Sequence, residues 1–198
     1  SQQIRSGDVR EIEKEEIIIL RNLGIGSIFR ADLAYYIEEE TLVAVKTQHR
    51  LSNEINKLIE REIDFYSKFQ HPFFPKFYGR IKDQNSIVIE FINGITLNEA
   101  IIDKKSLNSE KIELTFEEKI RIIYEIMLAI EFLHENEIIY RDLKPNNIMI
   151  DENRIAVLID FNRIVYRGMD FDSSNHTNDF GSDYAAPGVN ENHFSYSV

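Results

Sequence analysis

A carboxylate, an amine and an amide lie close together in the segment Tyr140–Asn147, which reads YRDLKPNN. Asp142 follows the apolar run Ile138–Tyr140, Lys144 lies two residues further on, and Asn147 lies five residues further on. Phosphoryl transfer requires a carboxylate that accepts the proton of the attacking hydroxyl, a cation beside the moving group and an oxygen ligand for Mg²⁺. These three side chains supply all of them within one loop, so a plain Asp- and Asn-rich surface turn is the weaker interpretation.

A further carboxylate follows at a spacing that fits the same chemistry. Asp160 begins the triplet Asp160–Asn162, thirteen residues after Asn147 and directly after the apolar run Ala156–Ile159. A carboxylate at the end of a strand can ligate a Mg²⁺ ion that bridges nucleotide phosphates. An apolar strand followed by Asp is common by itself. Its distance from Asn147 is what favours a metal ligand.

The first half of the chain contains a glycine pair between two strand-like runs, in the segment Leu23–Ser27 (LGIGS). Glycines allow backbone N–H groups to approach phosphate oxygens because no Cβ intervenes. A single Gly-x-Gly is weak evidence, since it also occurs in ordinary hairpins.

Lys46 and Glu62 are charged residues at positions where apolar side chains are expected. Lys46 ends the apolar run Val43–Lys46, and Glu62 falls on the helical stripe that also carries Ile59 and Tyr66. A buried charge needs a partner. A Lys46–Glu62 ion pair explains both residues, whereas either one alone would be interpreted as a surface side chain whose charged end reaches water.

The elements that position these residues differ between the two halves of the chain. In the first half, short β-type runs surround one helix predicted over Asn53–Phe69. In the second half, a capping box at Thr115–Glu118 opens a long amphipathic helix over Thr115–Glu135. The strands are predicted at Ile17–Leu23, Ser27–Leu33, Leu42–Thr47, Phe77–Ile81, Ile87–Phe91, Ile148–Ile150 and Ala156–Ile159, and the apolar stripe of the long helix at Ile120, Ile123, Tyr124, Met127, Ile130 and Leu133.

The amino-acid composition limits the kinds of partner that this chain is expected to bind. The chain has 198 residues, no Cys, and 23 Lys and Arg against 34 Asp and Glu, for a net charge of -11. This balance argues against nucleic acid or an anionic membrane as the main partner. No apolar run approaches the ~20 residues that span a bilayer, so we expect a soluble, cytoplasmic protein. Residues 1–16 are polar and of mixed charge, which predicts a mobile tail or a peripheral segment.

These motifs together resemble the eukaryotic-type protein kinases of the Ser/Thr class, from the glycine loop to the end of the activation segment. The resemblance implies an α+β, two-lobed fold, with a β-rich N-lobe containing one helix at 17–91 and an incomplete helical C-lobe at 92–198. It also implies ATP and Mg²⁺ as cofactors and a protein as substrate. Oligomeric state is not readable from the sequence.

The resemblance assigns a role to each motif. Asp142 is the catalytic base and Lys144 steadies the γ-phosphate. Lys46 holds the α- and β-phosphates and is itself held by Glu62. The remaining assignments are Mg²⁺ ligands at Asn147 and Asp160, a phosphate loop at Gly24, Ile25, Gly26 and Ser27, a gatekeeper at Ile89, hinge residues at Glu90, Phe91 and Ile92, an adenine sandwich of Ala31, Ala44 and Met149, and an aromatic column of Tyr66, Phe77, Tyr140 and Phe161.

The chain departs from the family pattern at several points. Phe29 replaces the third glycine of the phosphate loop and is expected to restrict closure of the loop. Asn162 replaces the glycine after Asp160-Phe161, and Asn tolerates positive φ. Gly188 replaces the glutamate after Ala-Pro. The chain also ends at Val198, before further C-lobe helices, so we expect the long helix to expose apolar surface.

Two other functions therefore stay open. A pseudokinase or nucleotide-binding scaffold is favoured by the replacements at Phe29 and Gly188. A small-molecule kinase of related fold fits the Tyr140–Asn147 string less well. Ser173, Ser174 and Thr177 are candidate phosphorylation sites in the predicted activation loop, where a phosphate could pair with Arg141.

Overall fold

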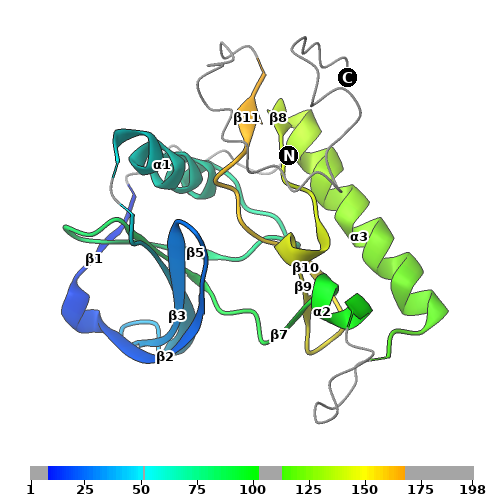
Figure 1. The fold of residues 1–198 in the computed structure, drawn as a ribbon, viewed down its shortest axis with the longest axis horizontal. Helices are drawn as coiled ribbons and strands as arrows, with labels where there is room; N and C mark the ends of the chain where they lie inside the picture. The colour runs from blue at the N-terminus through cyan, green and yellow to red at the C-terminus, as the bar shows by residue number, and fades with distance from the viewer. Residues whose placement is uncertain (1–8, 51, 103–112, 168–198) are drawn as a thin grey trace.

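The computed structural model describes residues 9–50, 52–102 and 113–167 (Figure 1). Its first half is a six-stranded sheet in the order β1-β5-β6-β4-β3-β2, in which every neighbouring pair is antiparallel except β1 and β5. The strands are β1 (Glu11–Ile12), β2 (Ile17–Ile25), β3 (Phe29–Tyr36), β4 (Thr41–Gln48), β5 (Phe77–Ile81) and β6 (Ser86–Glu90), with the 3-10 turn η1 (Lys14–Glu16) before β2. The predicted strands are confirmed, although β3 begins at Phe29 rather than Ser27.

The two faces of this sheet have different roles because side chains alternate along each strand. On one face, Val43 and Val45 are buried in a small apolar core. On the other face, Lys46 on β4 lies opposite Ala31 on β3 and Ile87 on β6. Ile87 belongs to the larger core shared with the second half of the chain. The register therefore directs Lys46 toward the rest of the molecule.

The helix α1 (Asn53–Lys68) packs on that second face. Ser52 caps its first turn by accepting a hydrogen bond from the Ile55 N–H, as the preference of Ser for this position predicts. One side of α1 is buried and carries Ile59, Ile63 and Tyr66, all at most 3% exposed. Glu62 lies on this same side and is 0% exposed, so the predicted helix and its charged stripe position are confirmed.

Residues 9–16 differ from the prediction of a tail or peripheral segment. Strand β1 pairs with β5 in parallel, and Ile12 is fully buried in the smaller core. The Arg80 N–H donates to the Arg10 carbonyl at 2.9 Å, and the Lys82 N–H donates to the Ile12 carbonyl at 3.0 Å. The sequence did not reveal this strand because two residues are too few to show a hydrophobic period. Residues 1–8 lie outside the described part of the chain.

The second half is built around the long helix α3 (Phe116–Glu135), with small antiparallel sheets beside it (Figure 1). Thr115 and Glu118 form the predicted capping box. One sheet has the order β10-β9-β7 and the other pairs β11 with β8. The remaining elements are β7 (Gly94–Thr96), α2 (Leu97–Ile102), β8 (Ile138–Ile139), η2 (Pro145–Asn147), β9 (Ile148–Asp151), β10 (Ala156–Leu158) and β11 (Val165–Tyr166). The α+β class is confirmed.

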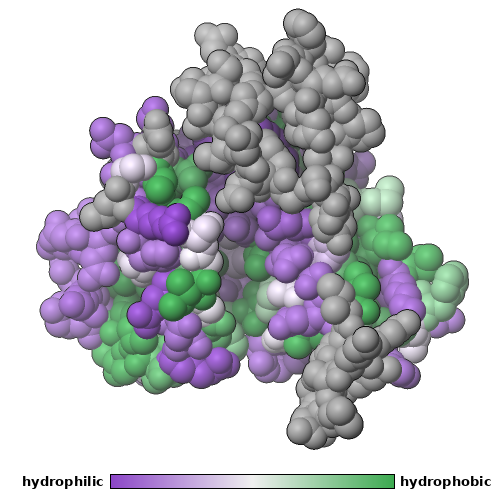
Figure 2. Space-filling view, viewed as in Figure 1, coloured by the Kyte–Doolittle hydropathy of each residue, from purple (hydrophilic) through white to green (hydrophobic). Residues whose placement is uncertain are grey.

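The buried face of α3 is not the predicted stripe. Ile122, Ala129 and Leu133 face the core together with Glu125, whose carboxylate accepts the Ala156 N–H at 2.7 Å. Of the predicted stripe only Leu133 is fully buried. The exposed apolar surface expected for this helix is confirmed and is visible in Figure 2; it comprises Phe116, Ile120, Ile123, Tyr124 and Met127. Within the described residues, no helix is both long and apolar enough to cross a membrane.

The placement of β1 in the sheet is testable by truncating its buried side chain. We predict that Ile12→Ala lowers the free energy of unfolding by about 2–5 kcal/mol, because it leaves a cavity in the smaller core. Ile18→Ala, at a side chain that is 49% exposed on β2, is the matched control and should change it by less than about 1 kcal/mol. Urea unfolding followed by circular dichroism measures both. Equal midpoints for the two variants would contradict the structure of residues 9–16.

Candidate active site

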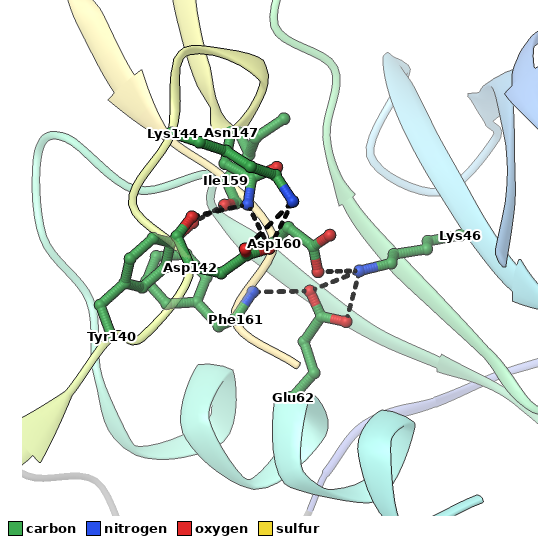
Figure 3. Close-up of polar contacts among 9 residues, drawn as sticks. All are labelled: Lys46, Glu62, Tyr140, Asp142, Lys144, Asn147, Ile159, Asp160 and Phe161. Atoms are coloured by element: carbon green, nitrogen blue, oxygen red, sulfur yellow. Dashed lines mark hydrogen bonds and ion pairs between the residues drawn. The ribbon is translucent and has the colours of Figure 1, made fainter. Parts of the chain in front are cut away.

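The site is organised around the ammonium group of Lys46 (Figure 3). Its Nζ atom lies 2.7 Å from Glu62 Oε2, 3.0 Å from Glu62 Oε1 and 2.8 Å from Asp160 Oδ1. A lysine ammonium has three N–H donors, and these three contacts use them all. The predicted pair of Lys46 and Glu62 is therefore confirmed, and Asp160, 114 residues away in sequence, completes it.

Each partner reaches this point from a different element. Lys46 extends from the central strand β4, Glu62 from the buried side of α1, and Asp160 from the segment just after β10. Glu62 Oε1 also accepts the Phe161 N–H at 3.2 Å. One carboxylate thus binds both the lysine of the sheet and the backbone beside Asp160, which fixes α1 between the two halves of the molecule.

Burial and charge compete in setting the pKa values of these groups. For Lys46, burial would lower the pKa, but the charges of Asp160 and Glu62 outweigh it and raise the pKa above its ordinary value. For Asp160, burial would raise the pKa, but the Lys46 ammonium outweighs it and lowers the pKa. Burial dominates for Glu62, whose pKa is raised. Asp160, whose side chain is 31% exposed against 1% for Glu62, is the more firmly ionised carboxylate.

The segment Tyr140–Asn147 forms a second polar cluster beside the first (Figure 3). Lys144 Nζ donates to both Asp142 carboxylate oxygens, at 3.0 Å and 2.9 Å. The Asn147 amide nitrogen donates to Asp142 Oδ2 at 2.8 Å and to its carbonyl at 2.9 Å. The three predicted residues are therefore brought together. The two clusters also interact electrostatically, because the charge of Lys144 contributes to the lowered pKa of Asp160.

Aromatic side chains pack beside the two polar clusters. Phe161 is fully buried, and its ring centroid lies 5.3 Å from that of Tyr66 and 5.5 Å from that of Tyr140. Tyr66 stacks on Phe77 at 5.6 Å, so the four predicted aromatic residues form one column. The Tyr140 hydroxyl donates to the Ile159 carbonyl. Burial raises the pKa of Tyr140 well above its ordinary value, so this hydroxyl keeps its proton.

Two residues beside the chemistry have left-handed backbone conformations, Arg141 with φ 68° and Asp160 with φ 67°. Neither is glycine, so each carries conformational strain that its surroundings must hold. The Ile159 N–H donates to the Asn147 carbonyl at 2.9 Å, and this hydrogen bond helps to hold the backbone beside Asp160 in place. The sequence placed the tolerance for positive φ at Asn162. Within the triplet Asp160–Asn162 the positive φ falls on Asp160 instead.

The residues predicted to surround an adenine come from both halves of the molecule. Ala31 faces Lys46 across the strands, and Ala44 faces Ile89, so these residues share one face of the sheet. Met149 is half-buried on β9 in the other half of the molecule. Glu90 is tied to Lys76 through backbone and carboxylate hydrogen bonds of 2.8 Å and 3.0 Å. Ile92 lies in the three-residue link between β6 and β7. Their contacts with a nucleotide remain predictions.

The glycine loop connects β2 to β3. Gly24 pairs with Ala31, and the Gly26 N–H closes the turn by donating to the Phe29 carbonyl at 2.8 Å. A Cβ added at Gly24 would meet nothing within 4 Å. The fold itself therefore does not require glycine there, and close approach of a ligand is a reason that remains. The other predicted loop residues, Ile25 and Ser27, are exposed.

The sequence reasoning missed three contacts. Phe65 stacks on Phe161 at a centroid distance of 4.2 Å, and its place on the buried side of α1 could have revealed it. The Tyr166 hydroxyl donates to Asp64 Oδ2 at 3.0 Å. Phe29 lies with its ring centroid 4.5 Å from Lys46 Nζ, a contact that no local pattern indicates. Residues Ser173, Ser174, Thr177 and Gly188 lie outside the described part of the chain.

The comparisons with known proteins agree with this geometry. A protein kinase domain model matches residues 17–198. The chain is 34% identical over 157 residues to a probable serine/threonine-protein kinase of Dictyostelium discoideum, covering 77% of this chain and 25% of that protein. It is 33% identical over 149 residues to the SNF1-like protein kinase ssp2 of Schizosaccharomyces pombe (73% and 24%), and 32% identical over 142 residues to U-box domain-containing protein 51 of Arabidopsis thaliana (69% and 17%). The chain thus spans about a quarter or less of these relatives.

The ionisation of Asp160 gives a pH-dependent prediction. Lys46 lowers the pKa of Asp160 in the folded protein below its ordinary value of 3.8. The negative charge of Asp160 therefore stabilises the fold at pH values above 3.8, and this stabilisation is lost as the pH falls through the lowered pKa. We predict that Asp160→Asn is less stable than the native chain at pH 7 and that the difference shrinks below pH ~4.

Urea unfolding at pH 7, 5 and 3 measures this difference. Asp83→Asn is the matched control, because Asp83 is an exposed aspartate that also has a positive φ, of 56°, and Asn adopts that conformation equally well. Its free energy of unfolding should stay within about 1 kcal/mol of that of the native chain. A stability difference for Asp160→Asn that is constant from pH 7 to pH 3 would contradict the role given to Lys46.

Proposed function

Because this chain belongs to the protein kinase domain family, we propose that it binds Mg-ATP and transfers the γ-phosphate to serine or threonine hydroxyls of proteins. The observation that carries the proposal is the convergence of two clusters, Lys46 with Glu62 and Asp160, and Asp142 with Lys144 and Asn147. Together they supply a base, cations for phosphate oxygens and oxygen ligands for a metal, which are the groups that phosphoryl transfer uses.

The donor set suits Mg²⁺ held jointly with a nucleotide. Asp160 offers a carboxylate, and Asn147 offers its amide oxygen, since its amide nitrogen is engaged by Asp142. Within residues 9–50, 52–102 and 113–167, no cluster of three or more His, Cys, Asp or Glu side chains could hold a metal by itself. Mg²⁺ prefers oxygen ligands and is commonly bound by one or two carboxylates plus substrate phosphates. When bound, it would neutralise charge on those phosphates.

The residues of the catalytic loop have distinct tasks in this reaction. The substrate hydroxyl oxygen bonds to the γ-phosphorus while the bond from that phosphorus to the β,γ-bridging oxygen breaks, and ADP leaves. Asp142 accepts the hydroxyl proton, and the hydrogen bond from Asn147 orients its carboxylate. Lys144 lies 2.9 Å from the same carboxylate, where its charge can follow the moving phosphoryl group. Such a base contributes about 10²- to 10⁴-fold to a rate.

A protein partner rather than nucleic acid or an anionic membrane is supported by the net charge of -11. We also propose a boundary between the two lobes near Ile92–Gly94 and a cytoplasmic location.

A nucleotide-binding scaffold without phosphotransfer is the second candidate. The observation that favours it is the state of Lys46, whose three donors are all engaged by carboxylates and whose ammonium lies beside the Phe29 ring. A site in this state has to rearrange before Lys46 can bind phosphate. Measuring nucleotide binding and phosphotransfer separately distinguishes the two candidates.

We predict that Asp142→Asn lowers transfer of labelled phosphate from ATP to a generic basic protein by about 10²- to 10⁴-fold. ATP binding should be retained, because the variant keeps the shape of the side chain while it removes the negative charge that pairs with Lys144 and accepts the proton. Both are measured on the purified chain with Mg²⁺ present, and Asp83→Asn serves as the control for an exposed aspartate. Nucleotide binding without transfer by the native chain would favour the scaffold. Equal transfer by the native chain and Asp142→Asn would contradict the assignment of the base.

A further inference from the structure

The ring of Phe29 lies over the ammonium of Lys46, with 4.5 Å between the ring centroid and Nζ. The register of the sheet explains this contact. Ala31 on β3 pairs with Lys46 on β4, and Phe29 is two residues from Ala31, so Phe29 and Lys46 are diagonal neighbours on one face of the sheet. That face is the one from which Lys46 reaches Glu62 and Asp160.

Phe29 is anchored in this position rather than free in solvent. Its side chain is half-buried and packs against the larger apolar core. Its carbonyl accepts the Gly26 N–H at 2.8 Å, and the His49 ring nitrogen lies 3.0 Å from the Gly26 carbonyl. The backbone N–H of His49 donates to the Ile28 carbonyl at 3.1 Å. The turn that carries Phe29 is thus tied to the end of β4.

The contact changes what Lys46 can offer to a ligand. Two carboxylates occupy its three N–H donors, and the side chain is 13% exposed. Phe29 is the loop residue whose ring lies against Lys46. The loop glycines leave room beside it, because a Cβ on Gly24 would meet nothing within 4 Å and one on Gly26 would only reach van der Waals contact at 3.4 Å. On the side of the glycine loop, it is therefore the Phe29 ring that lies against the Lys46 ammonium.

We propose that Phe29 is an aromatic cap on Lys46 that competes with the phosphates of a bound nucleotide, and so sets how much the phosphates contribute to affinity. The inference rests on the proposed nucleotide site. A cation over an aromatic face is attracted by the negative potential of the ring. Phosphate oxygens that approach Lys46 displace the ring and forfeit this attraction, whereas a nucleoside without phosphates leaves the ring in place.

The test compares adenosine with ATP on the native chain and on three variants of Phe29. Phe29→Leu keeps an apolar side chain but has no π face, Phe29→Ala removes the ring entirely, and Phe29→Tyr keeps a ring. Isothermal titration calorimetry with Mg²⁺ gives the ratio of the adenosine and ATP dissociation constants for each. We expect this ratio to rise on the order of tenfold in the Leu and Ala variants, through tighter ATP binding, and to stay unchanged in the Tyr variant.

Phe116→Leu is the matched control, since Phe116 is 72% exposed at the start of α3, away from the site. Its ratio should equal that of the native chain. Thermal unfolding of every variant checks folding, and Phe29→Leu keeps the test valid if Phe29→Ala does not fold. An unchanged or lower ratio in Phe29→Leu, with adenosine still bound, overturns the cap alone. If the native chain binds neither adenosine nor ATP, the nucleotide site and the cap are overturned together.

A spectroscopic measurement tests the cap without any nucleotide. The ring current of Phe29 should shift the NMR signals of the Lys46 ε-methylene protons upfield in the native chain. In Phe29→Leu these signals should return toward the range of the other lysines. Addition of ATP to the native chain should also move the Lys46 signals downfield, whereas addition of adenosine should leave them in place. Native Lys46 signals without an upfield shift would overturn the proposal.

Discussion

The rest of the structure depends on the ion pairs of the buried Lys46 ammonium. They connect the central sheet to the helix α1 through Glu62, and to the segment that follows β10 through Asp160. Removing one partner of a buried ion pair leaves an uncompensated charge and is costly, whereas the intact pair adds little net stability over apolar packing. The arrangement is therefore better understood as fixing the relative positions of three elements than as a source of stability.

The aromatic column makes that placement rigid. Phe161 follows Asp160 directly and is enclosed by rings from both halves of the chain, including Phe65 and Tyr140. Its N–H is bound by the same Glu62 carboxylate that holds Lys46. Polar and apolar contacts thus constrain the same two residues. This redundancy accounts for how Asp160, the proposed metal ligand, keeps a strained, positive φ.

Phe29 shows how one replacement in a short loop alters the chemistry of a distant charge. A glycine at this position would leave Lys46 open on the side of the loop. The phenylalanine instead extends the core to the edge of the ammonium. Nothing in the loop sequence itself indicates this, because the contact is made across strands and depends on the pairing of Ala31 with Lys46. The glycines that remain keep the backbone accessible, while the ring restricts the cation.

The sequence by itself determined most of the secondary-structure elements and the candidate residues that they carry. Tyr140–Asn147 and the capping box at Thr115 are local patterns, in which the residues that matter are neighbours in the chain. Tertiary structure alone decided the place of β1, the buried face of α3 and the position of Phe29. A two-residue strand has no period to detect, and a helix with apolar residues on several sides does not reveal which side meets the core. Contacts between distant residues follow from strand register and packing, which no single segment contains.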